Sequence, residues 1–136
     1  MIGRNNPLNI RYSPVNKWHG QSGYTKGFCN FRNIFCGIRA AAKLLMQSYP
    51  KQGFKTYDKI INRWAPSSEN PTSNYLSYIC DKCKVFPFDC PVSVEDYATL
   101  IYYMWCFEQG SKHRPDRSIA DIELMINDIE IYGSPL

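Results

Sequence analysis

Acidic residues are missing from the front of this chain. Residues 1–57 contain no aspartate and no glutamate, yet they carry nine of the 16 basic residues. The remaining residues hold all 12 acids against seven bases. This asymmetry indicates that one half faces an anionic polymer, or that the two halves attract each other once folded. Any catalytic carboxyl must come from Asp58 or later.

Long apolar runs are also missing. No run approaches the roughly 20 residues that a membrane-spanning helix needs, so we expect no membrane partner. Residues 1–7 have no apolar segment of the kind found in a signal peptide. We therefore expect synthesis in the cytoplasm without a signal peptide. If the protein acts outside the cytoplasm, something else must carry it there.

The cysteines lack the spacing of a metal site. Cys80-x-x-Cys83, with Cys90 nearby, has some character of a zinc site. However, the surrounding segment has a helical pattern, and no second close cysteine pair or histidine pair completes a tetrahedron. We predict no metal and no cofactor. The cysteines should pack as reduced, small hydrophobic side chains, and disulfides would need an oxidising compartment.

Length and periodicity predict a single domain over residues 1–136 that is mainly α, in the α+β class. Residues 1–33 should form a polar loop and hairpin segment, in which residues 9–12 could pair with residues 27–31. Residues 34–108 should form the helical core, and residues 109–136 an added C-terminal helix.

Helical signals are clearest in residues 34–49, where Ile38, Ala42, Leu45 and Tyr49 share one face. A short helix should begin at Thr56, and another should follow the break at residues 65–71. Ser93 and Ser118 are typical N-caps of two further helices. Glu95 and Asp96 fall in the first turn after Ser93.

Five separated motifs occur in order along the chain, and the first lies in the polar front segment. They are Arg4-Asn5-Asn6-Pro7-x-Asn9-Ile10-Arg11-Tyr12, Trp18-x-Gly20-Gln21, Gly27-Phe28-x-x-Phe31, Gly37-Ile38-Arg39-Ala40 and Arg63-Trp64-Ala65-Pro66-x-x-Glu69-Asn70-x-Thr72-x-x-Tyr75. This series resembles a family of small phage and prophage virion proteins, often described as structural proteins and thought to be lysozyme-like. The resemblance covers roughly residues 4–108. A more distant similarity runs to bacterial cell-wall glucosaminidases.

The resemblance implies a lysozyme-like helical fold and two kinds of partner, bacterial peptidoglycan and other virion proteins. The chain departs from the family at Leu8, where a glycine is usual. Glycine would permit a positive φ or the close approach of a ligand, so Leu8 puts that contact in doubt.

Amides and aromatic rings in the polar front segment suit a carbohydrate. Asparagine and glutamine side chains carry donors and acceptors for hydroxyl and acetamido groups, and aromatic faces can stack on sugar rings. The amides could instead hold turns, and Trp64 could belong to the core. The predicted substrate-binding residues are Asn5, Asn6, Asn9, Arg11, Tyr12, Trp18, Gln21, Tyr24 and Trp64.

Glycan cleavage needs a carboxylic acid that protonates the leaving oxygen. The resemblance implies an acid on a helix ahead of the asparagine-rich segment, but only residues 1–3 precede that segment here. Our candidate is Glu69, whose pKa partial burial could raise, although an acid before a helix could equally serve as a cap. Glu95 is explained by the first turn of its helix, and Glu108 by a solvated helix end.

The leading hypothesis is therefore a phage-type, lysozyme-like protein directed at peptidoglycan, acting as a glycoside hydrolase or lytic transglycosylase. A non-catalytic virion or cell-wall-binding module on the same fold is the first alternative. The second is a cysteine amidase or peptidase with Cys36 as nucleophile and His19 or His113 as base. Nucleic acid is not an expected partner, because no recognisable nucleic-acid-binding motif is present.

Overall fold

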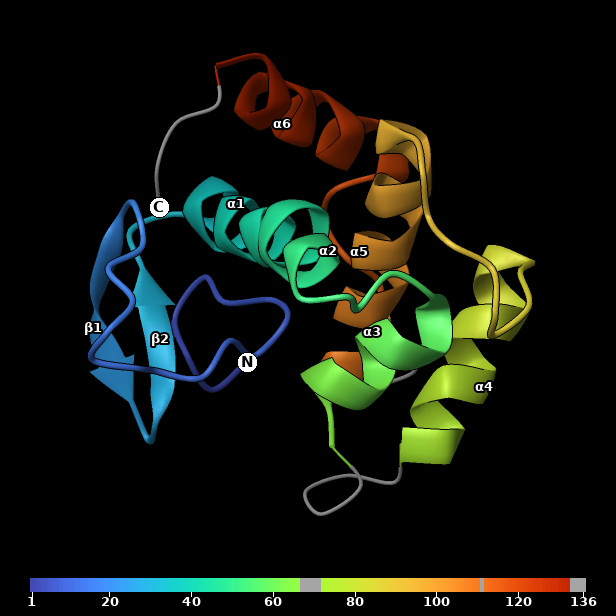
Figure 1. Ribbon diagram of the computed structural model, residues 1–136. Helices are drawn as coiled ribbons and strands as arrows, with labels where there is room; N and C mark the ends of the chain where they lie inside the picture. The colour runs from blue at the N-terminus through green and yellow to red at the C-terminus, as the bar shows by residue number, and fades with distance from the viewer. Residues whose placement is uncertain (67–71, 111, 133–136) are drawn as a thin grey trace.

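The computed structural model describes residues 1–66, 72–110 and 112–132. This part of the chain is mainly helical, with one two-stranded antiparallel hairpin near the N-terminus, so the α+β prediction is confirmed. Figure 1 shows the hairpin at one side of the molecule and the helices at the other. The N-terminal segment lies between them. It is therefore placed to connect the two parts.

The hairpin consists of β1 (Gln21–Thr25) and β2 (Phe28–Phe31). Lys26 and Gly27 form the turn with φ angles of 50° and 83°, and this left-handed pair suits the right-handed twist of a hairpin. The predicted pairing of residues 9–12 with 27–31 is reduced to a single bridge between Arg11 and Phe28. The main partner of β2 is β1, whose exposed side chains and glycine hide any alternation of polarity.

One continuous helical rod follows the hairpin. It consists of α1 (Ile34–Lys43), the π-helical turn η1 (Leu44–Ser48) and α2 (Tyr49–Lys51). The Asn33 side chain caps its start by accepting a hydrogen bond from the Cys36 N–H. Pro50 has no N–H to donate, which agrees with the irregular pattern of backbone hydrogen bonds in η1. The predicted helix over residues 34–49 is confirmed, with this wider turn in its second half.

Four more helices complete the described chain: α3 (Tyr57–Trp64), α4 (Thr72–Cys83), α5 (Val94–Glu108) and α6 (Ile119–Tyr132). Ser93 caps α5 in a reciprocal capping box with Asp96. The Ser118 hydroxyl accepts a hydrogen bond from the Asp121 N–H at the start of α6. Both predicted caps are confirmed. Helix α5 contacts α1, α4 and α6, and α3 packs on α4.

A single hydrophobic cluster takes in side chains from Leu8 to Ile129. Ile122 and Ile126 of α6 are fully buried in it. Leu8 is fully buried as well and places an apolar anchor in the N-terminal segment. Left-handed backbone occurs instead at Asn5 (φ 55°) and Asn9 (φ 54°), where asparagine tolerates it better than most residues.

Gly37 brings the N-terminal segment against α1. A Cβ atom added there would collide with the backbone oxygen of Asn5 and lie 3.0 Å from Cδ of Pro7. The absence of a side chain at Gly37 therefore allows the backbone of residues 5–7 to lie directly on the helix.

We predict that Gly37→Ala lowers the free energy of unfolding by about 1–3 kcal/mol, because crowding of the backbone outweighs the better helix propensity of alanine. Urea unfolding followed by circular dichroism measures the change. Ser77→Ala is the matched control, because Ser77 is exposed on α4 and should tolerate alanine. A Gly37→Ala protein at least as stable as the wild type would contradict this packing.

Candidate functional site

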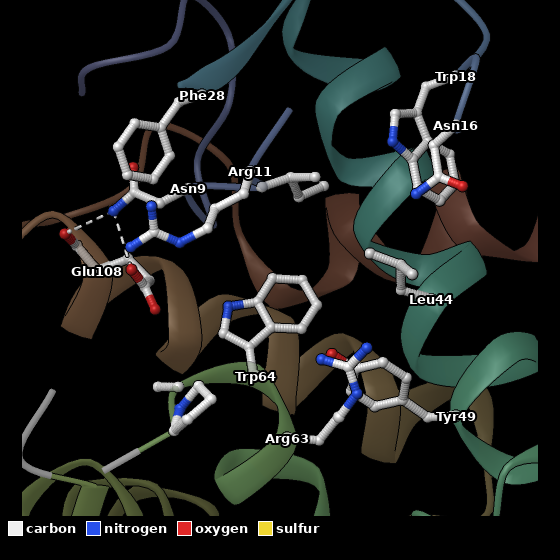
Figure 2. Close-up of a pocket in the computed structure, with 13 residues that line it drawn as sticks. Asn9, Arg11, Asn16, Trp18, Phe28, Leu44, Tyr49, Arg63, Trp64 and Glu108 are labelled. Atoms are coloured by element: carbon white, nitrogen blue, oxygen red, sulfur yellow. Dashed lines mark hydrogen bonds between the residues drawn. The ribbon is translucent and has the colours of Figure 1, made fainter. Parts of the chain in front are cut away.

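A groove of about 390 Å³ lies between the N-terminal segment and the helices. Its walls come from the N-terminal segment, β2, η1, α2, α3 with the residues that follow it, and the end of α5. Figure 2 shows Glu108 on one side, Trp64 in the middle and Trp18 on the opposite side. The lining residues are Asn9, Ile10, Arg11, Asn16, Trp18, Phe28, Leu44, Tyr49, Arg63, Trp64, Ala65, Pro66 and Glu108.

Glu108 is the only acidic residue among those lining residues. It is the last residue of α5, and its side chain is half-buried. The Asn9 Nδ2 donates hydrogen bonds to Glu108 Oε1 (2.8 Å) and to the Glu108 backbone oxygen (3.3 Å). These two bonds, drawn in Figure 2, tie the end of α5 to the N-terminal segment.

Burial raises the pKa of the Glu108 carboxyl above its ordinary value. The Asn9 amide, the Tyr75 hydroxyl, the positive charge of Arg11 and the Trp64 indole all act in the opposite direction, but burial prevails. A carboxyl that keeps its proton to a higher pH in a groove can donate that proton to a bound molecule. The groove therefore combines a binding surface with a potential proton donor.

Two tryptophans line the groove, Trp64 half-buried in the middle and Trp18 buried at one side. The Trp64 indole N–H donates to the Leu8 backbone oxygen at 3.3 Å, which fixes the ring. Trp18 is only 5% exposed, and its indole nitrogen has no hydrogen-bond partner among the described residues. Tyr49 packs edge-on against Trp64, with ring centroids 6.1 Å apart. The half-buried Trp64 is thus the ring of the three whose face could contact a sugar.

Four of the predicted binding residues meet in this groove: Asn9, Arg11, Trp18 and Trp64. Tyr12 and Gln21 line a shallower pocket that shares Trp18 with the groove. Tyr24 stacks on Tyr12 at a centroid distance of 4.2 Å and is exposed. These three residues thus extend the same surface toward the hairpin.

Asn5 and Asn6 do not line the groove. Asn6 is fully buried, and its amide bonds with the backbones of Ile10 and Cys29. The Asn5 side chain donates to the Phe31 backbone oxygen at 3.0 Å. In the structure both amides hold the N-terminal segment in shape, which is the alternative role considered for such residues.

Glu69, the predicted acid, lies outside the described residues. Glu108 was expected to be a solvated helix end, and this expectation is wrong, because the N-terminal segment covers the end of α5. The spacing of apolar residues in α5 could have predicted that Glu108 is partly buried. Ile101, Trp105 and Glu108 follow one another at spacings of four and three, so Glu108 continues the buried face of the helix.

The structure offers little to the thiol alternative. Cys36 is buried and lines none of the described pockets. His19 lies 3.1 Å from the Arg32 guanidinium, and His113 stacks near Trp105. Across residues 1–66, 72–110 and 112–132, no three histidine, cysteine or acidic side chains gather as metal ligands would. Over the same ranges, every helix is too short or too polar to cross a bilayer.

The chain is similar to a known phage protein. No protein-family model matches the chain. Protein P5 of Pseudoalteromonas phage PM2 is 34% identical to it over 114 residues. The aligned part spans 81% of this chain and 71% of the phage protein. The similarity therefore extends over most of both proteins.

We predict that Asn9→Gly raises the pKa of Glu108 further, because the variant removes a hydrogen bond that lowers this pKa while still allowing a positive φ. NMR titration of the glutamate side-chain carbonyl carbons measures the pKa. Asn16→Ala, in the same groove but away from Glu108 in Figure 2, should leave it unchanged. A lower pKa in Asn9→Gly would refute this account of the carboxyl.

We also predict that Glu108→Gln stabilises the fold at neutral pH, by about 1 kcal/mol or less. A carboxyl whose folded pKa is raised contributes stability fully below the unfolded pKa of about 4.3 and loses it as pH rises through the folded pKa. Glutamine carries no charge to bury. Urea unfolding at several pH values should therefore show a gain that grows from acid to neutral pH. A gain largest in acid would contradict the sign of the pKa shift.

Proposed function

The chain belongs to the family of Protein P5 of Pseudoalteromonas phage PM2, and from this premise we propose that it is a phage protein that cleaves the glycan strands of bacterial peptidoglycan. In this proposal it acts on a lysozyme-like helical scaffold, and Glu108 is the general acid. Association with other virion proteins would carry it to the cell wall.

One observation supports the catalytic part of this proposal above all others. The Glu108 carboxyl lies half-buried in a groove, with its pKa raised by burial. Protonation of a glycosidic oxygen requires a carboxyl that keeps its proton near the working pH. Asn9 holds this carboxyl in place through a 2.8 Å hydrogen bond, so its direction is preset before substrate arrives.

The walls of the groove support a carbohydrate ligand. Trp64 is half-buried and offers a ring face, whereas Trp18 and Tyr49 are buried and line the groove beneath its surface. Asn16 carries an amide beside Trp18 in Figure 2. Rings that bind flat apolar CH surfaces, together with amides that bind hydroxyl and acetamido groups, are the chemistry that an amino-sugar polymer requires.

The proposed reaction begins with transfer of the Glu108 proton to the oxygen that links two sugars. The bond between that oxygen and the anomeric carbon then breaks, leaving a positively charged sugar. Water or a hydroxyl of the same sugar attacks this carbon, and the attacking oxygen returns its proton to the Glu108 carboxylate. The net charge of the protein is thereby restored.

We predict that Glu108→Gln lowers the release of sugar fragments from purified peptidoglycan sacculi at least about 100-fold, because the amide cannot donate an acidic proton. Chromatography with mass spectrometry of the soluble products measures the rate. Glu95→Gln is the matched control, since Glu95 is an exposed carboxylate at the opposite end of α5. It should retain the wild-type rate.

Glu69→Gln distinguishes the two candidate acids. Loss of release in Glu69→Gln together with full activity in Glu108→Gln would overturn the assignment to Glu108. Binding of the wild type to sacculi without any release would instead identify a non-catalytic cell-wall-binding module. Loss of release in Cys36→Ala alone would favour the thiol mechanism.

The pH dependence of the same reaction gives a second test. The acid form of Glu108 is the active form, so the rate should fall as pH rises through its raised pKa, whereas an ordinary glutamate would already lose its proton near pH 4 to 5. Asn9→Gly should move this fall to higher pH. A rate that increases as Glu108 ionises would exclude the general-acid role.

A further inference from the structure

A second pocket of about 430 Å³ adjoins the groove. Its polar lining side chains are Lys59, Asn62 and Arg63, and Gly53 and Phe54 complete it. No acidic residue is among these lining residues. The charged side chains that line the pocket are therefore both cationic.

Arg63 belongs to both pockets. Its guanidinium lies over the rings of Tyr49 (5.7 Å) and Phe54 (5.9 Å), and Figure 2 shows it beside Tyr49 at the edge of the groove. It makes no salt bridge with any residue that the structure describes. The two rings hold the guanidinium in place while its N–H donors remain free to bind an anion.

The acid nearest to this pocket in sequence does not line it. It is Asp58, whose carboxylate accepts hydrogen bonds from the Thr56 hydroxyl and the Lys59 backbone N–H. The Asn62 side chain donates to the Asp58 backbone oxygen at 2.7 Å. Lys59 itself is exposed. An arriving carboxylate would thus meet two cations and no free acid among the pocket-lining residues.

We infer that this pocket binds a carboxylate on a side branch of the sugar that occupies the adjoining groove. The inference rests on the proposed function and adds which chemical group of the glycan is bound beside the groove, and by which residues. In peptidoglycan the branch is the lactyl group with its attached peptide. Arg63 lies between the two pockets, so its guanidinium can bind the branch carboxylate while the sugar ring occupies the groove. A guanidinium–carboxylate pair is a strong, directional contact.

Binding to three soluble glycans tests this inference. The first carries peptide branches, the second has lost its peptides but keeps the lactyl carboxylate, and the third is a chitin oligosaccharide of the same length with no carboxylate. Affinities are measured by titration calorimetry on Glu108→Gln, in which the proposed turnover is blocked. We expect the branched glycan to bind about tenfold more tightly than chitin, and this advantage to shrink at high salt.

Charge-removing variants locate the contact. In the Glu108→Gln background, Arg63→Gln and Lys59→Gln should each reduce affinity for the branched glycan about three- to tenfold. Lys59→Gln should leave chitin affinity unchanged, because Lys59 does not line the groove. Arg63→Gln should reduce chitin affinity less than it reduces affinity for the branched glycan. Lys84→Asn is the control: it removes one exposed positive charge at a residue outside this pocket, and asparagine tolerates the positive φ there. Lys84→Asn should keep the tighter binding of the branched glycan relative to chitin.

The second glycan identifies which carboxylate is bound. If the glycan without peptides still binds more tightly than chitin, the lactyl carboxylate is the bound group. If it binds no more tightly than chitin, the bound carboxylate belongs to the peptide. Equal affinity for the branched glycan and chitin would overturn the inference, as would an equal loss for both ligands in Arg63→Gln. Absence of sugar release by the wild type would overturn the catalytic proposal alone, because the affinity ratio is measured without turnover.

Discussion

Asn9 and Glu108 are 99 residues apart in the chain, yet a 2.8 Å hydrogen bond joins their side chains. Gln109 strengthens the junction by donating to the backbone oxygen of Pro7 at 2.8 Å. The groove exists because these bonds hold a polar loop against the end of α5. A loop of this length without such ties would keep its conformational freedom, and Glu108 would then be solvated like any helix end.

Packing beneath the loop makes this junction possible. Leu8 is fully buried immediately before Asn9 and receives the Trp64 indole N–H on its backbone oxygen. Gly37 lets residues 5–7 lie on α1 without a side chain between them. An apolar anchor, an aromatic donor and a missing side chain thus fix the backbone from which Asn9 reaches Glu108.

Neighbouring positive charge and burial shift the pKa of Glu108 in opposite directions. The acid-free front of the chain brings Arg11 near this carboxyl, and its positive charge favours the ionised form. Burial favours the protonated form and outweighs Arg11, Asn9 and the other neighbours together. The Glu108 carboxyl therefore keeps its proton to a higher pH than an ordinary glutamate, in a groove that also contains the cations Arg11 and Arg63.

Local sequence alone was sufficient for the helices and for their Ser93 and Ser118 caps, because these depend on neighbours within a few residues. It also singled out Asn9, Arg11, Trp18 and Trp64, which line one groove. Tertiary structure decided the rest. It turned Asn5 and Asn6 inward, and it covered Glu108 with a loop from the other end of the chain. Burial and pKa depend on contacts about a hundred residues apart, and no spacing rule carries that information.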